Sequence, residues 1–158
     1  MPVVATPTTP IVLTIDQVRR FMRDRPDTNI LLDTVEFSQE DINQGVELII
    51  SRYNSLTPVS GITVAAWPEA QKYVLLVGIT AYLLKSMAIQ QLRNQATYQD
   101  GDIAPIGIDD KSQAYLGLAQ TFDAEWLNLA TRIKAQRNLE SAYGSLHSGY
   151  NSNAYRYR

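Results

Sequence analysis

Hydrophobic residues recur at helical spacing in two long stretches of the chain. In the first stretch the apolar positions follow the order i, i+4, i+7, i+8 and i+11, and they are Ile42, Val46, Ile49, Ile50 and Tyr53. The second stripe consists of Tyr115, Leu118, Ala119, Phe122, Trp126, Leu129, Ala130 and Ile133. This spacing places each set on one face of an α-helix, so both sets are predicted to be core, with Trp126 as the anchor of the second.

Capping residues mark the expected starts of the first two helices. Thr14 and Gln17 have the spacing of a capping box, and they predict a short helix that ends before 24–26. Ser38 is followed by acidic residues, including Asp41, in the first turn of the next helix, where negative charge is favourable.

The segment 73–84 is apolar on every side and belongs to a third predicted helix, which starts at Pro68 and extends to about Asn94. A membrane span is the alternative for such a segment. Its twelve residues fall short of the roughly 20 needed to cross a bilayer, so we expect a buried helix at the centre of a bundle. The preceding stretch, 56–65, is rich in β-branched residues and is predicted to be a loop with at most one short strand.

These elements predict an all-α fold, a small bundle of about four helices with a long loop between the last two. The chain divides into an N-terminal arm (1–13), a helical bundle domain (14–139) and an extended C-terminal tail (140–158). The fourth helix is expected to be capped by Asp109 or Asp110. Basic residues near its C-terminal end would complement the helix dipole; they are Arg132, Lys134 and Arg137.

Composition narrows the possible chemistry. The 158 residues carry a net charge of −2 and no cysteine, which argues against a protein that coats phosphate backbones and excludes thiolate chemistry and disulfides. The single histidine, His147, has no nearby carboxylate to orient it, and no motif for acyl transfer, nucleotide binding or zinc hydrolysis is present. We therefore predict no enzymatic activity, no catalytic residue and no cofactor.

The only acidic group of note comprises Asp100, Asp102, Asp109 and Asp110. These carboxylates could surround a hard cation, but their spacing differs from that of an EF-hand loop. Turn and helix-cap roles explain the same residues, so no metal site is predicted.

The C-terminal tail combines aromatic and basic residues with a composition that forms no core. Its candidate binding residues are Tyr143, His147, Tyr150, Tyr155, Arg156, Tyr157 and Arg158. Tyrosine and arginine are enriched where binding energy concentrates in interfaces, which predicts a segment that docks on a partner. The alternative is an ordinary frayed terminus.

Two further segments have two interpretations each. The loop 97–108 carries Ile103, Ile106 and Ile108, which form either a patch tucked onto its own domain or a docking surface. The arginines between 19 and 25 form the only basic cluster, and it is either a solvated helix face or a surface for an acidic partner or DNA.

The order of helices, loop and tail resembles that of the head-tail connector (adaptor or neck) proteins of tailed bacteriophages. At the residue level the resemblance rests on three segments: AYLLKSMAIQQLRNQ (81–95), IDDKSQAYLGLAQTFDAEW (108–126) and GSLHSGY (144–150). Together they cover under half of the chain, and residues 1–37 contribute nothing.

The resemblance implies a structural virion protein in the neck, between the capsid portal and the tail, assembled in the host cytoplasm. Such proteins form a ring below the portal, usually a dodecamer, through which DNA passes without sequence recognition; membranes are not involved. The expected partners are the portal protein, neighbouring copies and a tail or neck completion protein, with the C-terminal tail docking on the portal. Contact with the next subunit or with the next ring would use the loop residues Asp100, Asp102, Ile103, Ile106 and Ile108.

Three other functions remain open at this point. A small terminase-like ring protein for DNA packaging would show salt-sensitive DNA binding. An unrelated helical interaction protein would share the fold but bind other partners. An enzyme using the acidic loop would be stabilised by a divalent cation.

Overall fold

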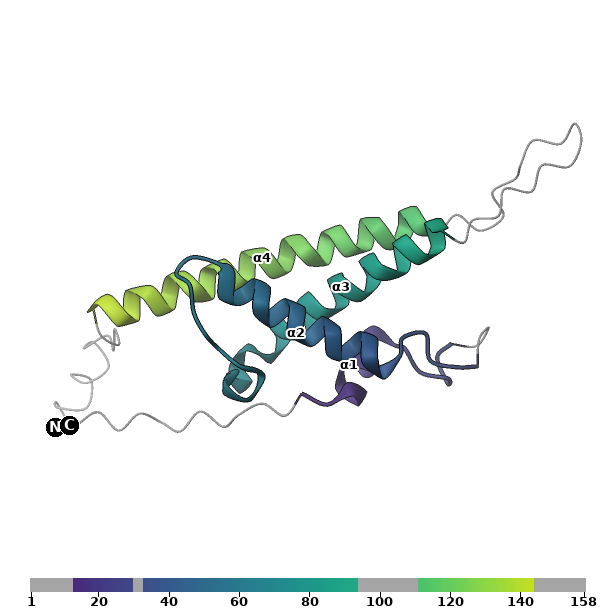
Figure 1. Cartoon of the computed structure of the whole chain (residues 1–158), viewed down its shortest axis with the longest axis horizontal. Helices are drawn as coiled ribbons and strands as arrows, with labels where there is room; N and C mark the ends of the chain where they lie inside the picture. Colours follow the sequence, from purple (N-terminus) through teal and green to yellow (C-terminus); the bar gives the residue numbers. More distant parts are fainter. Residues whose placement is uncertain (1–12, 30–32, 94–110, 144–158) are drawn as a thin grey trace, which may run out of the picture.

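The computed structural model describes residues 13–29, 33–93 and 111–143 (Figure 1). Within these ranges the chain forms four α-helices, α1 (Ile15–Met22), α2 (Gln39–Ser55), α3 (Lys72–Arg93) and α4 (Ser112–Tyr143), and two 3-10 turns, η1 (Val64–Ala66) and η2 (Glu69–Gln71). The described residues contain no strand, so the predicted all-α bundle is confirmed. The N-terminal arm, the loop 97–108 and most of the tail lie outside the described residues.

The helix α3 lies at the centre of the bundle. It runs alongside α4 over most of its length, and α2 and α1 pack against its other sides (Figure 1). Most of its apolar segment is buried as predicted, with Leu75, Val77, Ile79 and Leu83 fully buried, whereas Tyr73 at its start is 50% exposed. The stretch Glu69–Arg93 is long and apolar enough to cross a membrane, but 61% of its most apolar window is buried inside the protein. That burial is typical of a core helix.

Both predicted capping boxes are present. The Thr14 hydroxyl accepts a hydrogen bond from the Gln17 backbone N–H (3.4 Å), and the Gln17 side chain accepts one from the Thr14 N–H (3.3 Å). Ser38 and Asp41 exchange the equivalent pair of bonds, each 3.1 Å long. Each box satisfies two backbone donors that the first helical turn leaves free, which fixes where α1 and α2 begin.

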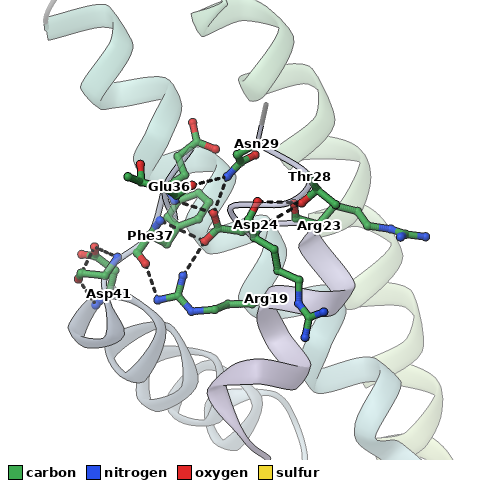
Figure 2. A network of polar contacts seen from close by, with 11 residues as sticks. Arg19, Arg23, Asp24, Thr28, Asn29, Glu36, Phe37 and Asp41 are labelled. Carbon is green, nitrogen blue, oxygen red and sulfur yellow. Dashed lines mark hydrogen bonds and ion pairs between the residues drawn. The ribbon is translucent and has the colours of Figure 1, made fainter. Parts of the chain in front are cut away.

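A buried carboxylate joins α1 to the start of α2 (Figure 2). Asp24 is 4% exposed, and its oxygens accept hydrogen bonds from Arg19 Nη1 (3.0 Å), Asn29 Nδ2 (3.0 Å) and the backbone N–H groups of Glu36 (2.6 Å) and Phe37 (3.2 Å). The Arg19 guanidinium also donates to the Phe37 carbonyl oxygen (2.8 Å). We call this set of residues the Asp24 clasp; it ties a stretch without secondary structure to α1 through bonds that carry charge.

The stripe predicted on α4 is largely confirmed. Trp126 is fully buried beneath α2 and α3, and Ala119 and Ala130 are buried beside it, whereas Leu118 is 48% exposed and was wrongly assigned to the core. Leu118 lies at the edge of the stripe, so a small rotation of the helix leaves it in solvent. The loop 56–63 contains no strand and leads into η1.

The role predicted for the basic residues of α4 is wrong. The helix continues to Tyr143, beyond the expected end near residue 139, and its last turn contains no basic residue. Lys134 is buried instead, 2% exposed, and its ammonium donates to the carbonyl oxygens of Leu56 (3.2 Å) and Pro58 (2.7 Å) and to Ser60 Oγ (2.6 Å). This lysine therefore fixes the 56–63 loop to α4.

Candidate functional site

The residues predicted to bind partners lie mostly outside the described part of the chain. Of the predicted tail residues, only Tyr143 is within α4, as its last residue; His147, Tyr150, Tyr155, Arg156, Tyr157 and Arg158 lie outside. The predicted loop contacts Asp100, Asp102, Ile103, Ile106 and Ile108 also lie outside. The helices that flank these segments, α3 and α4, are described, and together with α2 they line a groove.

A groove with a volume of about 870 Å³ opens between α2 and α4, above α3. Its lining consists of Leu48, Ile49, Ser51, Arg52 and Ser55 from α2, Ala81, Tyr82 and Lys85 from α3, and Leu116, Ala119, Gln120, Asp123, Ala124 and Leu127 from α4. The groove therefore exposes part of α3 between the two helices that flank it. We call it the α2–α4 groove.

Apolar side chains line the floor of the groove and part of its rims. Ala81 and Ala119 are buried at the floor, and their small side chains leave room above them. Leu48 on α2 is 44% exposed and Leu127 on α4 is 42% exposed. Large apolar side chains that remain exposed around a concavity are typical of a site that binds an apolar segment.

Ile89 and Leu92 continue the exposed apolar surface along α3. They follow Lys85 at i+4 and i+7, which places them on the same helical face, and they are 52% and 61% exposed. The exposed apolar surface therefore runs from the groove towards the end of α3 at Arg93.

An ion pair crosses the groove between α2 and α4. The two terminal nitrogens of the Arg52 guanidinium, Nη1 and Nη2, donate to the carboxylate of Asp123, with Nη2 3.1 Å from Oδ2. The guanidinium carbon lies 4.4 Å from the centre of the Trp126 ring. Hydrogen bonding from Arg52 lowers the pKa of Asp123 below its usual value, so the pair is charged at neutral pH. The charges of the pair cancel within the groove.

Lys85 is the remaining charged residue of the groove. Within the described residues it forms no hydrogen bond or ion pair, and it is exposed. The groove thus combines a partly apolar lining with one positive charge that forms no hydrogen bond or ion pair within the described residues, although it acts electrostatically on the Asp123 carboxylate. A bound segment with acidic residues would complement this charge.

The basic cluster near α1 is largely neutralised by its own segment. The described ion pairs are Arg19–Asp24 (3.0 Å), Arg20–Asp16 (2.7 Å) and Arg25–Asp16 (2.7 Å). Hydrogen bonding from Arg25 also lowers the pKa of Asp16. Arginines held by neighbouring carboxylates are less available for phosphate groups, which weighs against DNA binding at this surface.

Sequence reasoning missed the groove. Leu116, Gln120, Asp123 and Leu127 form a second stripe on α4 at i, i+4, i+7 and i+11, roughly a third of a turn from the core stripe. This second stripe is not recognisable as one face because it mixes apolar and polar residues, although its two leucines at helical spacing indicate an exposed apolar surface. No group of three or more His, Cys, Asp or Glu side chains able to hold a metal ion occurs in the part of the chain that the structure describes.

Comparisons with protein-family models, with curated proteins and with solved structures found no match to this chain.

Proposed function

We propose that this protein is a head-tail connector of a tailed bacteriophage, a structural virion protein that forms a ring below the portal and joins the capsid to the tail. The C-terminal tail docks on the portal, and the loop 97–108 contacts the next copy in the ring. The proposal rests on the similarity of three sequence segments to phage neck proteins, and the described helices supply a surface that a ring requires.

The observation that carries the assembly role is the α2–α4 groove with its exposed leucines. An isolated subunit gains nothing from leaving Leu48 and Leu127, and Ile89 and Leu92 beside the groove, partly in water, because each forgoes part of the roughly 1.5–3 kcal/mol that complete burial of such a side chain contributes. Exposed apolar surface of this kind is typical of subunits that bury it on association.

A ring also explains why the docking segment can be short. Each copy of the tail needs only a weak contact, because linking many copies in one ring makes every binding event after the first effectively intramolecular. Ordering a tail on binding costs conformational entropy, and multivalency offsets that cost.

The position of the protein in the particle tests this proposal. Antibodies raised against residues 13–93 are applied to purified particles of the virus and located with gold particles in the electron microscope, with particles lacking tails as a second sample. We expect label at the neck, between capsid and tail. Label on the capsid surface or the tail tip, or particles that lack the protein altogether, would contradict the proposal.

A further inference from the structure

Building on the proposed ring, we propose that the α2–α4 groove is the socket that receives the loop 97–108 of the neighbouring copy. Each subunit then presents two different surfaces, the groove and the loop. Contacts between two different surfaces are head-to-tail, and they close into a ring when the rotation between copies allows it.

The number of residues between α3 and α4 supports this loop as the occupant. The helices end and begin at Arg93 and Ser112, and the described residues leave out 94–110 between them. Adjacent antiparallel helices usually need only about 2–8 connecting residues. The connection is therefore much longer than the helix pair requires, and its surplus is free to serve a neighbour.

Chemistry also favours this segment. The residues 97–108 combine apolar Ile103, Ile106 and Ile108 with Asp100 and Asp102, and they include no basic residue. The apolar part of the lining suits the isoleucines, and the Lys85 ammonium, which forms no direct ion pair within the described residues, suits the aspartates.

The two terminal segments fit the groove less well. The tail 144–158 carries Arg156 and Arg158 and no acidic side chain, so it would bring like charge towards Lys85. The N-terminal segment 1–12 has no charged side chain and would leave Lys85 without a partner. Of the three segments outside the described helices that are long enough to fill the groove, only the loop offers both the apolar and the acidic residues.

Cysteine cross-linking tests the inference, because the natural chain has no cysteine. Two full-length single variants, Leu127→Cys in the groove and Ile103→Cys in the loop, are mixed and mildly oxidised. Leu139→Cys replaces Leu127→Cys in the control mixture, since Leu139 lies on the same helix and is similarly exposed, at 51%. We expect disulfide-linked dimers in the first mixture, at least about tenfold more than in the control, with the junction identified by mass spectrometry.

A charge swap provides an independent test of the same contact. Lys85→Glu in the groove-cysteine chain is expected to lower the dimer yield about tenfold, because it places like charges together. Asp100→Lys with Asp102→Lys in the loop-cysteine chain is expected to restore the yield. Failure of the swap to restore it would show that Lys85 does not face these aspartates.

Two results would overturn the proposed socket. One is a cross-link that forms only within a single chain when both cysteines are present, which would place the loop in its own groove. The other is the absence of a specific cross-link at every protein concentration tested. If native mass spectrometry shows that rings still form in either case, the socket proposal is wrong and the connector proposal is unaffected. If the cross-linked rings form but the protein is absent from virus particles, only the connector proposal is wrong.

Discussion

Removal of the Asp24 carboxylate is expected to destabilise the protein more than removal of any exposed charge. Asp24 accepts four hydrogen bonds while only 4% of it is exposed, and two of the donors are the backbone N–H groups of Glu36 and Phe37. The Asp24→Ala variant leaves these two backbone donors without a partner and removes the carboxylate that pairs with Arg19, which keeps only its hydrogen bond to the Phe37 carbonyl oxygen.

The magnitude follows from these contacts. Removing one partner of a buried ion pair lowers the free energy of unfolding by about 3–5 kcal/mol, and each buried donor left without an acceptor contributes about 1–3 kcal/mol of that loss. We expect Asp24→Ala to lower the free energy of unfolding by about 3–5 kcal/mol, which corresponds to about 6–20 °C in Tm for a chain of this size. Asp24→Asn keeps one acceptor oxygen but turns an amide towards donors, so about 2–3 kcal/mol is expected.

Urea denaturation followed by circular dichroism measures these differences. Asp27→Asn is the matched control, because Asp27 lies in the same connection, is exposed and has no described side-chain partner; its effect should stay within about 0.5 kcal/mol. A loss below about 1 kcal/mol for Asp24→Ala would refute the reasoning, since the clasp would then be replaceable by water.

Four further substitutions test the packing and the electrostatics. A Cβ at Gly78 would lie 2.6 Å from the indole ring of α4, so Gly78→Ala should cost about 1–3 kcal/mol in urea denaturation, whereas Gly117→Ala, which meets nothing within 4 Å, should stabilise by about 0.5–1 kcal/mol. Burial, followed by the negative charge of Asp24, raises the pKa of Glu36 above 4.5, so the free energy of unfolding falls as the pH rises from 4.5 through the raised pKa. The Glu36→Gln variant should therefore be more stable than the natural chain at pH 7 and equally stable below about pH 4, as measured by urea denaturation at both pH values. Lys134→Met removes three hydrogen bonds to the 56–63 loop, so it should lower the free energy of unfolding by about 2 kcal/mol, measured by urea denaturation, and speed proteolysis within that loop, measured by mass spectrometry of the fragments. Unchanged cleavage would contradict the conclusion that Lys134 holds the loop against α4.

The helices could be predicted because their signals are local. Thr14 and Ser38 start helices through residues only three positions away, and the apolar segment of α3 is long enough to require burial whatever surrounds it. These features depend on neighbours in the sequence, and the structure agrees with them.

The Asp24 clasp and the burial of Lys134 could not be predicted, because their partners are distant in sequence. Asp24 accepts from a backbone N–H thirteen residues away, and Lys134 donates to carbonyl oxygens more than seventy residues away. Charged residues are usually exposed, and nothing in the neighbouring sequence indicates that these two are buried. The groove was missed for a related reason, since it exists only where α2 and α4 flank the same side of α3.

The structure also shows at which residue the chain can be truncated so that the tail is removed and the helical bundle stays intact. Because α4 continues to Tyr143, a chain that ends at Tyr143 keeps the whole helix, whereas one that ends at Glu140 loses its last residues. A truncation after Tyr143 therefore removes 144–158 alone.

Capture of the portal protein by the full chain and by the chain ending at Tyr143 tests the central claim most directly. Both chains are immobilised at equal density after circular dichroism has shown the same helix content, and purified portal protein of the same virus is passed over them. The account predicts that the full chain retains the portal and that the shortened chain loses at least about 90% of the binding, because all of the predicted docking residues except Tyr143 have gone. Equal retention by both chains, or no retention by the full chain, would contradict the account.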